Sequence, residues 1–333
     1  MLLLVAVVVL VVLGRGASYS PSGWIQIGSL ALVAAGLIVQ RARGAAGGGV
    51  VLFLGVVLVR VLWIGSGQGT LHTLPGDSGS RWLGRAIDEQ DGSLLGARVL
   101  TRAWPLAPGE KEAIVPAMHE AYVAMRHSEG STPTATLDTL LGRQSGDAFD
   151  TIVFEPRDAT APRAAVVFLH GYGGAFTLEC WMVAEAARSV GALTVCPSMG
   201  FDGAWWTGEG ERRVRAALDF VDTRKIGPVF LAGLSNGGAG ASLLAGRLAN
   251  RLAGLILISG VSEDGSTAGL PTLVVHGEQD RVMSRAAARA FADRTGSTYT
   301  EFSGGHFVML VKREAVEEAM SQWLQRAMNA RGL

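Results

Sequence analysis

The pattern of apolar and polar positions divides the chain into two unequal parts. Three apolar runs, at residues 1–13, 24–40 and 48–65, precede the first acidic residue, Asp77. A helix needs about 20 largely apolar residues to cross a bilayer. The second and third runs are therefore predicted to span a membrane. The first run is a short span, the tail of a longer one or the core of a signal peptide.

Beyond these runs the pattern is typical of a soluble protein. Residues 109–126 read as one amphipathic helix with an apolar stripe, formed by Ile114, Met118, Tyr122 and Val123. The remainder of residues 67–148 shows no motif. We therefore predict a membrane anchor at residues 1–66 and a helical extension or linker at residues 67–148.

From residue 149 to residue 333 short apolar runs alternate with helical segments. This alternation predicts a mostly parallel sheet flanked by helices, the α/β class. The predicted strands cover residues 151–155, 165–170, 193–197, 229–234, 255–259, 273–277 and 299–302. The predicted helices cover residues 176–189, 209–223, 236–250, 283–294 and 313–328. The central strands are continuous Val/Ile/Leu runs, as expected of strands buried on both faces.

Composition and charge narrow the class of protein. Of 333 residues 49% are hydrophobic and only 17% are charged, against roughly 25% charged in soluble domains, which agrees with a membrane part. Basic and acidic residues number 29 each. The chain therefore lacks the net positive charge that is typical of nucleic-acid-binding proteins. The two cysteines and six histidines have no metal-ligand spacing. We expect no metal and no cofactor.

Loop arginines predict the orientation in the membrane. The loop at residues 41–47 carries Arg41 and Arg43, whereas the preceding loop carries only Arg15. Because positive loops stay in the cytoplasm, the domain beyond residue 67 is predicted to be extracytoplasmic.

Cys180 and Cys196 are predicted on a helix and on the next strand, where an oxidising compartment permits a bridge. A pair of buried thiols is the alternative.

The clearest chemical motif is Gly-Leu-Ser-Asn-Gly at residues 233–237. It follows the predicted strand 229–234 and precedes a Gly/Ala-rich helix. A serine in this G-x-S-x-G context occupies a sharp strand-to-helix turn, and small neighbours let the backbone pass closely. The pattern predicts Ser235 as a nucleophile.

Three further loops follow predicted strands. His-Gly-Tyr-Gly-Gly at residues 170–174 can direct backbone N–H groups at an oxyanion. No G-x-G-x-x-G or G-K-[ST] pattern follows it, which disfavours nucleotide binding. Asp280 and His306 stand in the other two loops. The order Ser235, Asp280, His306 is the chain order of a hydrolase triad.

Together these motifs resemble the α/β-hydrolase superfamily of serine hydrolases, in its esterase/lipase-like branch, over residues 149–330. The resemblance implies Ser235 as nucleophile, His306 as general base and then acid, and Asp280 as the residue that orients His306. It implies an oxyanion hole formed by the backbone N–H groups of Tyr172 and Asn236. Glu278 is the alternative acid.

The substrate is less defined by sequence. The connection at residues 260–271 is too short for the lid domain often found there, which predicts an open site. Trp205 and Trp206 are candidates to bind substrate, with core packing as the alternative. We predict a membrane-anchored esterase acting on a small-molecule or lipid ester, or a thioester. A serine peptidase, a lipase or phospholipase, and a non-catalytic binding protein of this fold are the alternatives.

Overall fold

The computed structural model describes residues 19–38, 43–63, 69–76, 82–157 and 161–332. The predicted apolar run at residues 1–13 and Arg41 lie outside these residues. One sheet contains all eight described strands. They are β1 (Gly69–Leu74), β2 (Phe149–Phe154), β3 (Ala164–Leu169), β4 (Ala192–Pro197), β5 (Val229–Leu234), β6 (Gly254–Ile258), β7 (Thr272–Gly277) and β8 (Thr298–Phe302).

The sheet has the order β1-β2-β4-β3-β5-β6-β7-β8. Strand β2 pairs antiparallel with both β1 and β4, whereas β3 to β8 pair in parallel. The seven predicted strands and five predicted helices of this region agree with the structure to within two residues at each end. This mostly parallel sheet, with a serine turn directly after β5, is an α/β-hydrolase fold, which confirms the predicted class.

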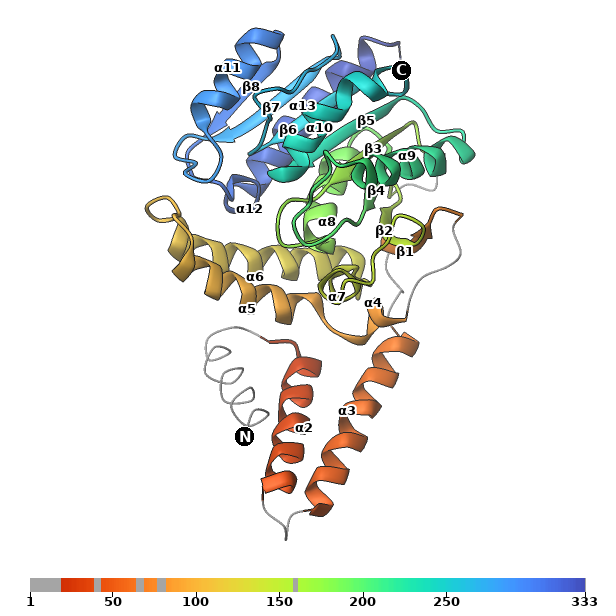
Figure 1. Cartoon of the computed structure of the whole chain (residues 1–333), viewed down its shortest axis with the longest axis vertical. Coiled ribbons are helices and arrows are strands. Elements are labelled where there is room, and N and C mark those ends of the chain that lie inside the picture. Colours follow the sequence, from red (N-terminus) through yellow and green to blue (C-terminus); the bar gives the residue numbers. More distant parts are fainter. Residues whose placement is uncertain (1–18, 39–42, 64–68, 77–81, 158–160, 333) are drawn as a thin grey trace.

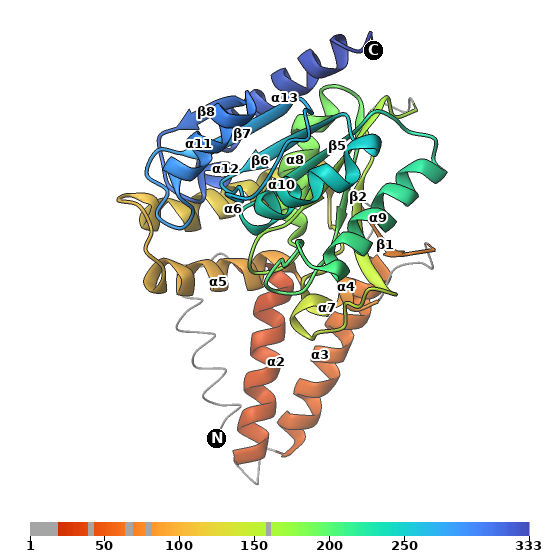
Figure 2. The same cartoon turned by 45° about the horizontal axis from the view of Figure 1, so that its top comes forward.

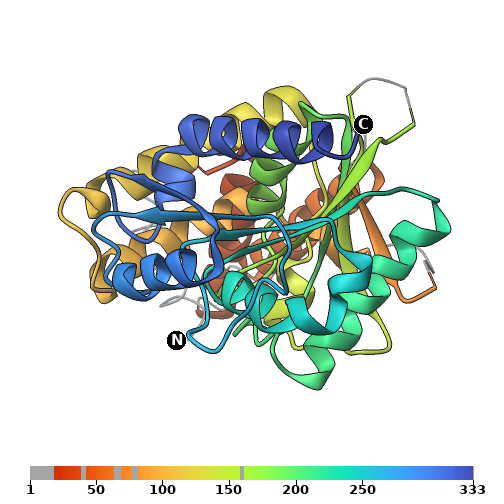
Figure 3. The ribbon, with the colours of Figure 1, turned by 90° about the horizontal axis from the view of Figure 1, so that it is seen from above.

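Helices cover both faces of the sheet (Figure 3). One face packs against α8 (Thr177–Arg188) and α13 (Arg313–Asn329) through residues such as Trp181, Met320 and Trp323. The other face packs against α9 (Gly208–Thr223), α10 (Asn236–Leu248) and α11 (Arg285–Thr295). Strands β2 to β7 are buried nearly throughout, so the strand ends emerge from a rigid support.

Residues 69–140 form more than a helical extension. They contain α4 (Leu83–Ala86), α5 (Glu89–Ala103), α6 (Glu110–Glu129) and α7 (Thr136–Leu140), but also the edge strand β1. The predicted boundary at residue 149 therefore divides a continuous sheet, because β1 pairs with β2 along its whole length. On α6, Ile114 and Tyr122 are buried as predicted, whereas Val123 is 53% exposed.

Within the part of the chain that the structure describes, two helices are long and apolar enough to cross a bilayer, α2 (Pro21–Ile38) and α3 (Arg43–Trp63). They pack against each other and project away from the sheet, with α5 and α6 between them and it (Figures 1 and 2). Many of their apolar side chains are exposed, among them Ile25, Leu32, Leu37, Val51, Leu54 and Leu62.

Polar contacts join these helices to the extension. Ser20 donates hydrogen bonds from its N–H and hydroxyl to the carboxylate of Asp91, at 2.6 and 2.7 Å. Arg60 on α3 donates to the Ile87 carbonyl at 2.9 Å and lies 3.4 Å from Asp88. The start of α5 is thus attached to both apolar helices.

The structure pairs the two cysteines of the chain. Cys180 on α8 and Cys196 on β4 form a disulfide, with their Cα atoms 6.0 Å apart. Both side chains are buried. The bridge ties a helix on one face of the sheet to the strand beneath it, and replaces the alternative of two free thiols.

Candidate active site

Ser235 stands in the strained turn that joins β5 to α10. Its φ is +53°, a conformation that L-residues rarely adopt and that recurs at functional sites. The crossing backbone explains the flanking glycines. A Cβ on Gly233 would lie 2.3 Å from the backbone of Gly237, and one on Gly237 would lie 2.0 Å from the Leu169 carbonyl oxygen. Both positions therefore require glycine.

The structure brings the three predicted triad residues together. His306 Nε2 lies 3.0 Å from Ser235 Oγ, and His306 Nδ1 lies 2.9 Å from Asp280 Oδ2. Ser235 and His306 are 7% and 5% exposed. A neutral histidine can thus accept the serine proton at Nε2 while Nδ1 donates to the carboxylate, which is the geometry of an activated nucleophile.

Asp280 is held as an anion by its surroundings. Its Oδ1 accepts the N–H groups of Val282 and Met283 at 2.8 and 2.9 Å. Burial alone raises the pKa of this carboxyl, but His306 and the two N–H groups outweigh it and keep the pKa below its ordinary value. Glu278, the alternative acid, is exposed. The geometry therefore favours Asp280.

Candidate oxyanion donors lie beside the serine. A Cβ on Gly171 would meet Ser235 Cβ at 3.1 Å, so the loop that carries Tyr172 passes directly over the nucleophile. Asn236 begins α10, and its side chain donates to the Asp202 carbonyl at 2.8 Å. Within the described residues, the backbone N–H groups of Tyr172 and Asn236 donate to no protein acceptor. They are available to stabilise an oxyanion.

His170 anchors that loop from within the domain. Its Nε2 accepts the N–H of Met199 at 2.9 Å, so Nδ1 carries the proton and donates to the Gly171 carbonyl at 2.7 Å. Both nitrogens are therefore used by the neutral ring. Burial lowers the pKa of His170 to about 4.

The structure corrects the prediction for one tryptophan. Trp205 is fully buried, and its indole N–H donates to the His170 carbonyl at 2.9 Å. It packs in the core beside α10, where Gly240 leaves room for it, so it cannot contact a substrate. Trp206 is 45% exposed, and its role in substrate binding stays a prediction.

Sequence reasoning missed two buried glutamates from the extension. Glu110 Oε1 accepts the N–H of Phe307, next to His306, at 2.8 Å, and its Oε2 accepts the Ala107 N–H at 3.1 Å. Glu89 accepts the N–H groups of the first two residues of α8 at 2.7 and 3.0 Å. The extension thus holds both the histidine loop and the helix after the oxyanion loop.

Glu89 and Glu110 gave no local signal in the sequence. Each stands in the first turn of a helix, where an acid is ordinary because it complements the helix dipole. Only the folded contacts distinguish them from surface acids.

His276 is the remaining polar group near Asp280. Its Nε2 lies 3.4 Å from Asp280 Oδ2 and 3.3 Å from the Met283 carbonyl oxygen. Burial lowers the pKa of this histidine and favours its neutral form. It supports the loop that carries the acid.

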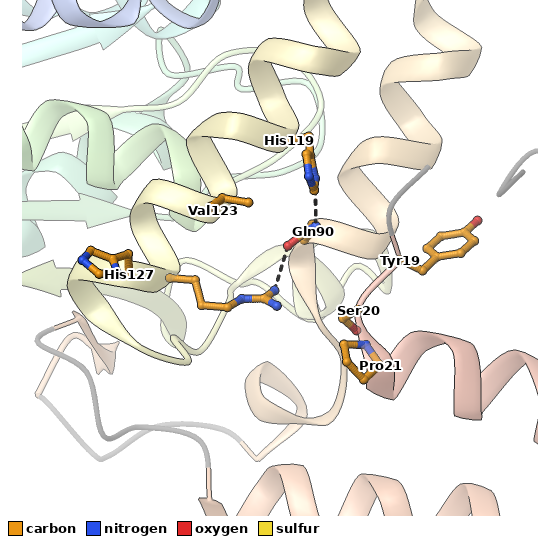
Figure 4. Close-up of a pocket in the computed structure, with 8 residues that line it drawn as sticks. Tyr19, Ser20, Pro21, Gln90, His119, Val123 and His127 are labelled. Atoms are coloured by element: carbon orange, nitrogen blue, oxygen red, sulfur yellow. Dashed lines mark hydrogen bonds between the residues drawn. The ribbon is translucent and has the colours of Figure 1, made fainter. Parts of the chain in front are cut away.

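One hollow of the described structure lies away from these residues. A cavity of about 400 Å³ opens where the start of α2 meets α5 and α6 (Figure 4). It is lined by Tyr19, Ser20, Pro21, Gln90, His119, Val123, Arg126 and His127. None of the triad residues is among them. Among the described residues, no cluster of His, Cys, Asp and Glu is arranged to hold a metal ion.

No protein-family model matches the chain, and no curated protein sequence matches it. Solved structures match about half of it. Est1E from Butyrivibrio proteoclasticus, solved with ferulic acid, shares 17% identity at a TM-score of 0.48, over 55% of this chain and 96% of its own. XC6422 from Xanthomonas campestris, an α/β serine hydrolase without lid, shares 19% at 0.45, over 55% and 91%.

A third match is an α/β serine hydrolase homologue from Coxiella burnetii, with 17% identity at a TM-score of 0.42, over 53% of this chain and 91% of its own. These likenesses, at TM-scores of 0.42 to 0.48, carry no conclusion about activity. Activity has to be argued from the residues of the site.

Proposed function

We propose that this chain is a serine hydrolase that cleaves carboxylic esters or thioesters through an acyl-enzyme. The observation that carries the proposal is the relay from Ser235 Oγ through His306 to Asp280, at 3.0 and 2.9 Å. A serine hydroxyl is a weak nucleophile until a base takes its proton. The relay supplies that base, already oriented and hydrogen-bonded.

Each step uses a group placed in this site. Ser235 Oγ attacks the carbonyl carbon and its proton passes to His306 Nε2. The N–H groups of Tyr172 and Asn236 stabilise the oxyanion, each worth roughly 3–4 kcal/mol by comparison with donor deletions. His306 then protonates the leaving alcohol or thiol as its bond to carbon breaks. A water molecule, deprotonated by His306, releases the acid and restores Ser235.

The membrane part of the proposal has separate support. A core helix of a soluble protein would be mostly buried, whereas α3 is largely exposed and carries one charged residue in its apolar window, Arg60. In our proposal α2 and α3 anchor the chain and the hydrolase domain is extracytoplasmic. The Cys180–Cys196 bridge supports an oxidising compartment. A reporter active only in the cytoplasm, fused after Gln68, should be inactive.

The decisive test of the chemistry is labelling of the full chain with a fluorophosphonate, a reagent for activated serines. We expect the parent to be labelled and Ser235→Ala to be unlabelled, with Ser321→Ala on α13 as the control serine that retains the label. A folded parent that takes no label would make the protein a non-catalytic member of this fold. Ester, thioester, peptide and phospholipid substrates would then separate the esterase from the peptidase and lipase alternatives.

A further inference from the structure

Three aromatic rings from three different segments meet beside the nucleophile turn. The rings of Tyr172 and Phe201 lie 4.9 Å apart in an edge-to-face arrangement, and the ring of Trp104 lies 6.1 Å from that of Tyr172. Tyr172 is 53% and Phe201 43% exposed. We call these three side chains the aromatic cluster. Much of the ring surface of Tyr172 and Phe201 is therefore exposed to solvent rather than packed in the core.

Backbone contacts fix the cluster against the catalytic serine. Tyr172 follows Gly171, where an added Cβ would lie 3.1 Å from the Cβ of Ser235. The N–H of Gly173 donates to the Phe201 carbonyl at 2.8 Å. Asn236 reaches the same loop through its bond to Asp202. The loops that carry Tyr172 and Phe201 are therefore held beside the oxyanion donors.

The Gly173–Phe201 backbone bond thus joins the two loops that carry these rings. Trp104 brings the extension to the same place. It caps the C-terminus of α5, where its N–H donates to the Leu100 carbonyl and its own carbonyl accepts the N–H of Leu106 at 2.9 Å. Trp104 is half-buried and packs against the core, and its ring lies 6.1 Å from that of Tyr172. The extension supplies one wall of the cluster.

The reaction geometry determines where each part of an ester lies around Ser235. In the tetrahedral intermediate the oxyanion points at the N–H groups of Tyr172 and Asn236, and the leaving group must lie next to His306 Nε2 to receive its proton. The acyl substituent is then left to the side away from His306. The loops that carry Tyr172 and Phe201 border the serine at the oxyanion donors, which puts the acyl substituent within their reach in our proposal.

On this basis, and resting on the proposed function, we infer that the aromatic cluster is a subsite for an apolar acyl group. Exposed ring faces and edges bind alkyl and aryl groups by excluding water, at about 0.8 kcal/mol per buried CH₂. The cluster should therefore favour longer acyl chains over acetyl and leave the alcohol part of the ester unselected.

The test uses the full chain in phosphatidylcholine discs with 4-nitrophenyl acetate, butanoate and hexanoate, which share one leaving group. The measured quantity is the ratio of kcat/KM for hexanoate to that for acetate. We expect this ratio to fall about tenfold in Trp104→Ala and in Phe201→Ala, which corresponds to about two CH₂ groups no longer buried. Trp104→Phe should recover part of the ratio.

Trp82→Ala is the matched control, because Trp82 is a 57% exposed tryptophan of the extension outside the cluster. Its ratio should equal that of the parent. An unchanged ratio in both cluster variants, or an equal fall in Trp82→Ala, overturns the subsite. If the parent takes no fluorophosphonate label, the proposed function itself fails; a labelled parent isolates failure of the subsite.

Discussion

The strand-end loops of the sheet and the α5–α6 hairpin contribute to the candidate site in different ways. The loops carry the proposed reacting groups, Ser235, Asp280 and His306, at 3.0 and 2.9 Å along the relay. The hairpin carries buried carboxylates that bind backbone N–H groups and never reach the serine. Glu110 holds the loop after β8 and Glu89 holds the start of α8.

This difference shows how a fold without a lid domain can still fix its catalytic loops. Within the described residues, the connection between β6 and β7 contains no helix or strand. The hairpin instead lies between the sheet and the two apolar helices (Figure 1). Because Asp88 and Asp91 bind Arg60 and Ser20, the hairpin links the two apolar helices to the site.

The largest effect should come from the reacting group itself. Ser235→Ala removes the nucleophile, so kcat on the best 4-nitrophenyl ester should fall by about 10⁵-fold or more. Stopped-time assays of the full chain, with unchanged thermal unfolding as the check on folding, measure it. Activity that persists in the folded variant would place the nucleophile elsewhere, and the contrast between the strand-end loops and the hairpin would no longer hold.

The next effect separates the two acids of the β7 loop. Asp280→Asn should lower kcat by about 10³–10⁴-fold, because the amide can hold His306 in the wrong tautomer. Glu278→Gln is the matched control, since Glu278 is exposed, and it should retain parental activity. The reverse result would make Glu278 the acid.

The reacting groups were predictable from sequence because their signals are local. Ser235, Asp280 and His306 each follow a strand, and the carboxyl ends of parallel strands meet at one edge of the sheet. The strained turn at Ser235 is also local, since it follows from the glycines around it. Only the fold was needed to bring the three together.

The supporting groups depend on distant partners. Glu110 binds a residue 197 positions along the chain, and Glu89 binds residues 88 and 89 positions away. No periodicity encodes such pairs. Strand β1 was missed for a similar reason, because six residues that begin with Gly69 give a weak signal until β2 pairs with them. Trp205 was misplaced because an aromatic after a strand can face either the core or a substrate.

The hairpin's share of the activity can be measured at Glu110. Glu110→Ala leaves the partly buried N–H of Phe307 without its acceptor, at a cost of about 1 kcal/mol. The histidine loop should relax, and kcat should fall about tenfold with KM little changed. Glu110→Gln keeps an oxygen acceptor and should recover part of kcat, which a simple loss of stability would not reproduce at a temperature where both variants are folded.

Glu112→Ala is the control for this experiment, because Glu112 lies in the same helical turn and is exposed. It should behave as the parent does. If Glu110→Ala matched the parent too, the hairpin would only cover the sheet. A loss as large as that of Asp280→Asn would erase the distinction between reacting and supporting groups.

The smallest effect concerns His170, which directly follows β3 and holds the oxyanion loop. Its pKa is about 4 in the folded chain, against an ordinary value of 6.5. Below pH 6.5 the His170 imidazole therefore binds a proton in the unfolded chain but not in the folded chain. The free energy of unfolding consequently falls as the pH drops from 7 toward 4. Between pH 7 and pH 5 the loss is about 2 kcal/mol, or about 5 °C in Tm.

His170→Gln isolates this contribution. The glutamine stays neutral and its oxygen can still accept the N–H of Met199, so its Tm should fall about 5 °C less than that of the parent between pH 7 and pH 5. Glu179, whose pKa burial raises to about 8, changes stability in the opposite direction, but it does so equally in both proteins. Parallel Tm curves would mean that His170 titrates normally, and that the oxyanion loop depends on the hairpin rather than on the buried imidazole.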